Sequence, residues 1–263
     1  MKKIKATLTA LALSVGFAFT ASGQMFQDLF NEDFGSLADG TTITTNNTDL
    51  TYVRVGTQGG SISIKNPSSF SSGASAVIIG PSGGSLNGVG ATGLAPFPIY
   101  EMAFDFRLGN TSGNMVFGVG DGSSFTGNTG FTTSQGLFWF QVNQGQLQRR
   151  TSAWVDVDDT LSIDTNYSIR IVANGSAESF TYDSNKALSA GTMNVYLNGT
   201  NIASEVAVTN SLSATAFRIY SVSGSNFEVD NITISAVPEP ATYAAIVGLL
   251  AVGLVIVRRR MRM

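Results

Sequence analysis

The chain has no cysteine and no histidine among its 263 residues. Without cysteine there are no disulfides, so the apolar core has to supply the stability of any folded domain. The usual zinc ligands are missing, and so are a Ser-His-Asp triad, a Cys-His pair and any histidine general base. These absences exclude most hydrolase mechanisms, and we expect a protein that is not an enzyme.

Positive charge is scarce in the middle of the chain. Of the 15 lysines and arginines, seven lie in the first five or the last six residues, whereas 17 of the 18 acidic residues lie between residues 24 and 236. The span 24–236 therefore carries about nine net negative charges. Because nucleic-acid binding begins with a basic surface, we expect no nucleic-acid partner. Divalent cations and neutral glycans are better candidates.

Long apolar runs are confined to the two ends of the chain. Three lysines within the first five residues precede an apolar stretch at 6–19, and the small residues 21–23 follow it. This order is typical of a secretory signal peptide that signal peptidase removes. We therefore expect residues 1–23 to be a signal, Gln24 to begin the mature chain, and the protein to be exported. The alternative is that residues 6–19 form an ordinary buried helix.

The C-terminal segment, residues 237–263, has three parts in a fixed order. They are the tripeptide Pro238, Glu239 and Pro240, an apolar run from Ala241 to Val257, and the cluster Arg258, Arg259 and Arg260. The prolines block a helix across the tripeptide, so Glu239 is expected on an extended, accessible strip. The 17 apolar residues would span roughly 25 Å as a helix, at the short limit for crossing a bilayer. Arginine is retained on the cytoplasmic side, which places the rest of the chain outside.

This combination of an N-terminal signal with Pro238-Glu239-Pro240, a short transmembrane helix and Arg258 to Arg260 resembles the PEP-CTERM family of exported bacterial proteins. The resemblance implies that an exosortase, a membrane transpeptidase-like protease, recognises the tail and cuts near the tripeptide. The protein would pass through an inner-membrane intermediate to the cell surface or extracellular matrix, with a structural or adhesive role in exopolysaccharide or biofilm. The alternative is a permanent single-pass anchor, which the same apolar run and arginines fit equally well.

Between the two signals, residues 24–236 show apolar residues with a period of two, separated by turn residues. The pattern predicts one all-β domain, an antiparallel jelly-roll β-sandwich long enough to bury a substantial core. We expect strands at 51–55, 61–65, 76–79, 100–108, 115–119, 137–142, 147–151, 167–172, 179–182, 193–197, 216–221 and 227–234.

Three local irregularities are expected in this sandwich. Asn143-Gln144-Gly145 and Asn198-Gly199 contain residues that tolerate positive φ, which tight hairpin turns require. The last strand changes its alternation at Asp230-Asn231, which predicts a β-bulge. The alternative is a last strand buried on both faces.

Four segments of the body together resemble the concanavalin-like jelly-roll modules related to laminin-G domains. They are residues 31–35, 167–172, 195–200 and 229–232. The resemblance implies binding of glycans or proteins, sometimes through calcium. If the first and last strands pair, Glu32 or Asp33 would approach Asp230, and carboxylates are ligands that calcium prefers. The alternative is that these acids are solvated strand ends.

Aromatic side chains supply the candidate glycan-binding residues. Trp154, Tyr167 and Tyr196 would stack on sugar rings if they face outward. Trp139 lies between two phenylalanines and is expected in the core. The chain would then be a lectin-like, polysaccharide-binding module rather than a purely structural protein.

A membrane-tethered glycoside hydrolase is the remaining hypothesis. Its best acid pair, Glu101 and Asp105, would lie roughly 13 Å apart along a strand, which exceeds the separations of retaining and inverting enzymes. The glycosidases of this fold use acids two residues apart, and Ala103 occupies that intervening position. The acids at 156, 158 and 159 are expected on a solvated loop. The sequence therefore argues against hydrolysis.

Overall fold

The computed structural model describes residues 26–35, 37–70, 73–83, 85–121, 132–158, 161–183 and 185–237. The regular structure of these residues consists of strands. They are β1 (Gln27–Glu32), β2 (Tyr52–Arg54), β3 (Ser61–Lys65), β4 (Ser75–Ile79), β5 (Leu86–Phe97), β6 (Ile99–Leu108), β7 (Asn114–Gly120), β8 (Gly136–Asn143), β9 (Gln146–Arg150), β10 (Trp154–Asp158), β11 (Asn166–Asn174), β12 (Phe180–Tyr182), β13 (Lys186–Leu188), β14 (Thr192–Leu197), β15 (Thr200–Ala207), β16 (Ala214–Val222) and β17 (Asn226–Ala236).

The predicted signal at 1–23 and the predicted sorting tail from Pro238 onward lie outside the described residues. Within the ranges given above, no helix is long and apolar enough to cross a membrane. Export, sorting and membrane insertion therefore stay predictions.

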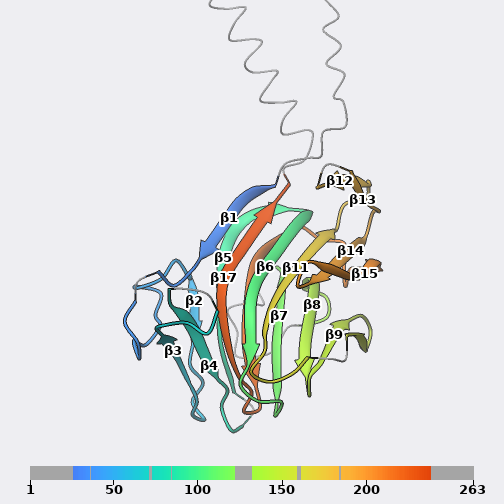
Figure 1. The fold of residues 1–263 in the computed structure, drawn as a ribbon. Helices are drawn as coiled ribbons and strands as arrows, with labels where there is room; N and C mark the ends of the chain where they lie inside the picture. Colours follow the sequence, from blue (N-terminus) through green and yellow to red (C-terminus); the bar gives the residue numbers. More distant parts are fainter. Residues whose placement is uncertain are drawn as a thin grey trace, which may run out of the picture.

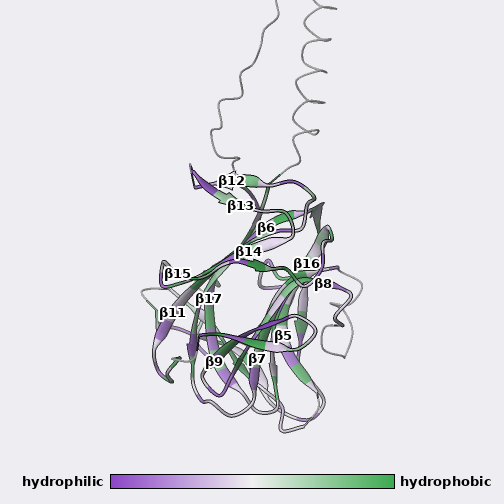
Figure 2. Ribbon diagram, turned by 90° about the vertical axis from the view of Figure 1, so that its right-hand side faces the viewer, coloured by the Kyte–Doolittle hydropathy of each residue, from purple (hydrophilic) through white to green (hydrophobic). Residues whose placement is uncertain are grey.

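Two antiparallel sheets form the sandwich (Figure 1). Sheet A has the order β15-β14-β11-β6-β17-β4-β3, with β1 also paired to β17, and sheet B has the order β10-β9-β8-β7-β16-β5-β2. Figure 2 shows them as separate layers, with β11, β15 and β17 in one and β5, β7, β8 and β16 in the other. Most neighbouring strands are not consecutive in the chain, as in a jelly roll. The predicted fold class is confirmed.

The core lies between the two sheets and is rich in phenylalanine. Phe104 of sheet A meets Phe117 of sheet B edge to face at 5.0 Å, and Phe117 stacks on Phe140 of the neighbouring strand at 5.5 Å. All three side chains are buried. Each such burial contributes about 1.5–3 kcal/mol, so a core of this kind stabilises the domain without disulfides.

The predicted turns and the bulge are confirmed. Gln144 and Gly145 join β8 to β9 with φ values of 52° and 81°, and Asn198 and Gly199 join β14 to β15 with 49° and 77°. Two successive positive φ values match the twist of the flanking strands, which is why these residue types occur there. In β17 the register with β6 shifts after Asp230, and Asn231 has a φ of 51°. Odd-numbered residues of the strand therefore face the core before this bulge, and even-numbered residues face it after the bulge.

Five strands were not predicted: β1, β5, β10, β13 and β15. The longest strand described, β5, contains glycines and a proline that hide its alternation. Two of its glycines are required by the closeness of β16, because a Cβ at Gly88 would lie 2.5 Å from Tyr220 Cβ and one at Gly90 would lie 2.3 Å from Phe217 O.

The prediction of a solvated acidic loop after Trp154 is wrong for Asp156 and Asp158. Both lie on β10, an edge strand paired with β9. Acidic side chains suit an edge strand because they discourage pairing with another chain. The third acid, at position 159, lies outside the described residues.

Candidate carbohydrate-binding face

The outer face of sheet B, opposite the core, presents aromatic and long polar side chains in register. We call it the aromatic face. One row crosses all seven strands: Trp154, Arg150, Trp139, Gly118, Arg218, Gly90 and Tyr52. The next row contains Asp156, Gln148, Gln141, Val116, Tyr220, Gly88 and Arg54. Residues far apart in the chain thus meet because the period of each strand brings alternate positions to this side.

Two tryptophans meet at the β10 edge of the aromatic face. The rings of Trp139 and Trp154 lie edge to face with centroids 6.1 Å apart. The guanidinium carbon of Arg150 lies 5.2 Å from the Trp154 centroid and 6.0 Å from that of Trp139. Trp139, expected in the core, is buried on this outer face instead, because its neighbours Phe138 and Phe140 take the core side of β8, and Trp154 is half-buried. Arg150 and Trp139 therefore hold in place an indole that still reaches solvent.

A chain of amide hydrogen bonds runs beside the tryptophans. Asn114 Nδ2 donates to Gln141 Oε1 at 3.0 Å, Gln141 Nε2 donates to Gln148 Oε1 at 2.6 Å, and Gln148 Nε2 donates to Asp156 Oδ1 at 2.7 Å. Each amide has its orientation fixed by the next one. Gln148 is half-buried and Asp156 is exposed, so the end of this chain beside Trp154 is accessible to polar groups of a ligand.

Arg218 occupies the middle of the aromatic face. Its guanidinium carbon lies 4.4 Å from the Tyr220 centroid and 5.7 Å from that of Tyr52. It is fully buried, with Gly118 opposite on β7 and Gly90 opposite on β5. Glycines on both sides leave the room in which a guanidinium can lie against aromatic rings.

The three aromatic residues predicted to bind glycan do not come together. Trp154 lies on the aromatic face. Tyr167 is instead in the core, 9 % exposed and stacked on Phe106 at 5.3 Å, and its hydroxyl accepts a hydrogen bond from the Ser162 backbone at 2.7 Å. Tyr196 is on sheet A and 5 % exposed, with its hydroxyl 2.6 Å from that of Tyr182. Neither tyrosine is accessible to a ligand, because Tyr167 lies in the core and Tyr196 is covered by the β12–β13 hairpin, and this corrects the prediction.

Tyr196 belongs to a structural cluster beneath the β12–β13 hairpin. Arg170 lies 5.5 Å from its ring and forms ion pairs of 2.6 Å with both Glu101 and Asp183. The hydrogen bond from Arg170 lowers the pKa of Asp183. These contacts fix the small hairpin on sheet A. Glu101, one of the two candidate hydrolase acids, is engaged in this cluster, whereas Asp105 accepts a hydrogen bond from Asn231 Nδ2 at 2.8 Å.

The predicted calcium residues lie where β1 pairs with β17. Glu32 lies opposite Ile232, so the condition on which the calcium hypothesis depended, pairing of the first and last strands, is met by β1 and β17. Its two carboxylate oxygens accept hydrogen bonds from the Phe34 and Asp49 backbones, each at 2.7 Å, and Asp33 accepts from the Gly35 backbone at 2.8 Å.

Asp230 is 2 % exposed, and burial, with Asp105 and Asp33 nearby, raises its pKa to about 7. In the described part of the chain no group of three or more acidic, histidine or cysteine side chains is arranged to hold a metal ion. Calcium binding stays a prediction.

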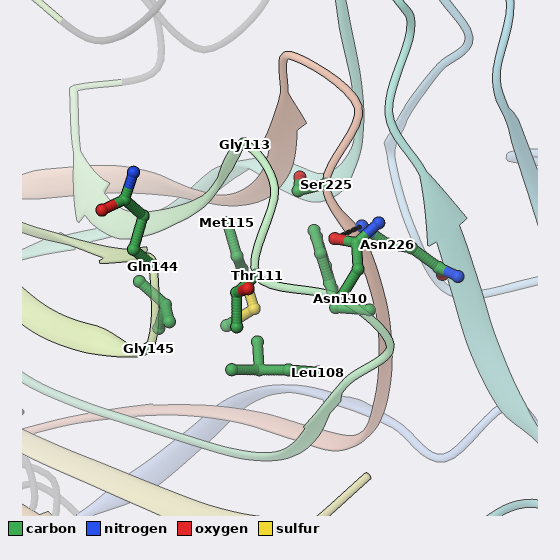
Figure 3. Close-up of a pocket in the computed structure, with 11 residues that line it drawn as sticks. Leu108, Asn110, Thr111, Gly113, Met115, Gln144, Gly145, Ser225 and Asn226 are labelled. Carbon is green, nitrogen blue, oxygen red and sulfur yellow. Dashed lines mark hydrogen bonds between the residues drawn. The ribbon is translucent and has the colours of Figure 1, made fainter. Parts of the chain in front are cut away.

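A small pocket lies where the β6–β7 loop, the β8–β9 turn and the β16–β17 loop approach one another (Figure 3). Leu108 and Met115 line it, and Asn110 accepts a hydrogen bond from the Asn226 backbone at 3.1 Å beside it. Its volume of about 10 Å³ suffices for one water molecule. The pocket is too small for a sugar.

Comparison with known proteins gives the fold class and no family. No protein-family model matches the chain, and no curated protein sequence matches it. Among solved structures, "Cellulose induced protein, Cip1" is similar with a TM-score of 0.51 and 16 % identity, over 78 % of this chain and 96 % of that one. At this identity the likeness shows the fold alone, the jelly-roll β-sandwich described above.

Two other solved structures show weaker likeness. A xylan-binding domain, CBM22-1 of Paenibacillus barcinonensis Xyn10C, has a TM-score of 0.39 and 12 % identity, over 82 % of this chain and 98 % of its own. A sialidase has a TM-score of 0.49 and 9 % identity, over 67 % of this chain. This chain spans only 16 % of the length of that sialidase.

Proposed function

We propose that the protein is an exported, non-catalytic polysaccharide-binding protein of the bacterial cell surface or extracellular matrix, and that it binds through the aromatic face. The observation that carries the proposal is the half-buried Trp154, held by Arg150 and Trp139 beside the ordered amides of Gln148 and Gln141. An aromatic ring offers an apolar surface to the C–H face of a sugar, and aligned amides exchange hydrogen bonds with its hydroxyls.

The terminal segments support the proposed location. A signal peptide at 1–23 would bring the chain to signal peptidase, and the tail from Pro238 to Arg260 would hold it in the inner membrane until an exosortase acts. The first and last described strands, β1 and β17, pair with each other in sheet A, whereas the aromatic face belongs to sheet B. The two strands next to these segments therefore belong to the sheet that does not carry the aromatic face.

Binding of insoluble and soluble polysaccharides to the full chain in mild detergent tests the proposal. We expect selective binding of a neutral polysaccharide such as a glucan or xylan, and binding about 5- to 10-fold weaker for Trp154→Ala, because one aromatic contact contributes about 1 kcal/mol. Trp154→Phe should retain most of the affinity. Val155→Ala, an exposed change on the same strand, is the matched control.

Two results would contradict the proposal. One is the absence of selective binding to any polysaccharide, which a purely structural protein would show. The other is equal binding by Trp154→Ala and the parent protein. Repeating the measurement with calcium and with a chelator shows whether binding depends on the metal.

A further inference from the structure

The outer face of sheet A contains a cleft of about 240 Å³, on the opposite side of the sandwich from the aromatic face. Val77, Glu228 and Arg107 lie side by side in it on β4, β17 and β6, and Lys65 of β3 is at its rim. The remaining lining residues are Gly109, Asp164, Asn226 and Phe227. The volume equals that of about eight water molecules, enough for one small polar group or ring.

Lys65 and Glu228 neutralise each other inside this cleft. Glu228 Oε2 is 3.0 Å from Lys65 Nζ, and Oε1 accepts hydrogen bonds from the Ser69 backbone at 2.7 Å and from Ser75 Oγ at 2.5 Å. Burial by itself would raise the pKa of Glu228, but the hydrogen bonds from Ser75 and Ser69 and the contact with Lys65 lower it. The carboxylate is thus ionised and fully engaged, and it does not oppose a second anion.

Arg107 is the cation of this cleft that has N–H donors to offer a ligand. Its two terminal nitrogens donate to Ser69 Oγ at 2.7 Å and to Asp164 Oδ1 at 2.9 Å, and each carries a second N–H, whereas Nε is buried from solvent. The side chain of Asp164 is 68 % exposed. A guanidinium offers parallel donors that match a carboxylate with two bonds. Asp164 uses only one of these donors, in an exposed ion pair of the kind that stabilises a fold little.

We propose that the cleft binds the carboxylate of an acidic sugar, a uronate residue of a polysaccharide, which replaces Asp164 on Arg107 and accepts hydrogen bonds from its two terminal nitrogens. Val77 forms an apolar wall for the ring. The inference rests on the proposed function in that the ligand is a polysaccharide, but it uses the opposite sheet. A protein with both sites connects a neutral chain on one face to an acidic chain on the other, and multivalent contact strengthens such a network.

Titration of the full chain with glucuronate and with polygalacturonate, and with glucose as the neutral counterpart, tests this site. We expect both uronates to bind and glucose not to bind in the cleft, with affinity falling as salt rises because the contact is ionic. Asp164→Asn should tighten uronate binding about 3- to 10-fold, since the amide is a weaker competitor for Arg107. Arg107→Lys should weaken uronate binding at least about 10-fold, because a lysine ammonium lacks the parallel N–H donors of a guanidinium.

The controls separate this proposal from the preceding one. Trp154→Ala should leave uronate binding unchanged, and Arg107→Lys should leave neutral-polysaccharide binding unchanged. Equal binding of uronate and glucose, or no tightening in Asp164→Asn, would overturn the proposal while leaving the aromatic face untouched. Thermal unfolding verifies that each variant is folded. If Arg107→Lys is unfolded, Asp164→Asn still decides the matter because its side chain is exposed.

Discussion

At the scale of single residues, Asp230 couples the stability of the sandwich to pH. Burial, with the nearby Asp105 and Asp33, raises its pKa to about 7, whereas an aspartate in the unfolded chain titrates near 4. Between these values the folded state binds the proton and the unfolded state does not, so stability falls as pH rises from about 4 to about 7 and stays reduced above that. A carboxylate forced to ionise in a buried bulge is the physical cause.

Asp230→Asn is expected to remove this pH dependence. The amide oxygen can still accept the hydrogen bond from the Asn231 backbone, which Asp230 Oδ1 accepts at 2.8 Å. Urea denaturation at pH 8 should show the variant more stable than the parent by about 1–2 kcal/mol, and the difference should vanish near pH 4. A constant difference across this range would contradict the assignment. If the predicted calcium site exists, calcium should stabilise the parent at pH 8 and not the variant.

Single residues also show how far the sequence alone could predict the site. Trp154 was found because an isolated indole beside polar residues is conspicuous. Tyr167 and Tyr196 are equally acceptable glycan-binding candidates from the sequence. In the structure, however, the Tyr167 side chain points between the sheets and that of Tyr196 lies under the β12–β13 hairpin. The alternation of Tyr167 with Ile169 and Ile171 is a local pattern that places it on the core face, whereas Tyr196 is buried by the β12–β13 hairpin, a contact that no local pattern encodes. The alignment of Gln141 with Gln148 depends on the register between β8 and β9, which is likewise non-local.

At the scale of elements, two hairpin turns offer a matched pair of glycines. Gly145 and Gly199 follow β8 and β14 with φ values of 81° and 77°. A Cβ at Gly199 would meet nothing within 4 Å, whereas one at Gly145 would lie 2.6 Å from Leu161 O. Gly199→Ala should therefore lower the free energy of unfolding by about 1–2 kcal/mol, which is the cost of a left-handed backbone conformation for a residue with a Cβ. Gly145→Ala should lower it by more, because a backbone oxygen has to move.

Urea denaturation of both variants measures the difference. Equal losses would show that the contact with Leu161 relaxes without strain. The turns were predictable from the sequence because positive φ selects glycine and asparagine locally. Strand β5 was not, because Gly88 and Gly90 meet a steric demand that comes from β16, more than a hundred residues later.

At the scale of the whole molecule, the sandwich limits where its tail can be cut. Strand β17 lies between β6 and β4 and also pairs with β1, and Val237 after it is buried and donates from its backbone nitrogen to Ile99 O at 3.1 Å. A cut within β17 would remove part of a central strand, and a cut directly after Ala236 would remove the buried Val237 and its hydrogen bond to Ile99. The apolar pattern of β17 predicted its burial, whereas its central place required the non-local pairing with β6.

The mature protein is therefore expected to begin at Gln24 and to end at or after Val237, without the arginine cluster from Arg258 to Arg260. The reason is physical: the pairing of β1 with β17 needs both strands complete, while the proposed sorting removes the transmembrane run after Pro240. Intact-mass spectrometry of protein recovered from the cell surface measures both ends. Replacing Glu239 with glutamine should leave the fold unchanged and retain the uncut form in the membrane. Recovery of a mature form that keeps Arg258 would show permanent anchoring, and a full-length chain in the cytoplasm would contradict export itself.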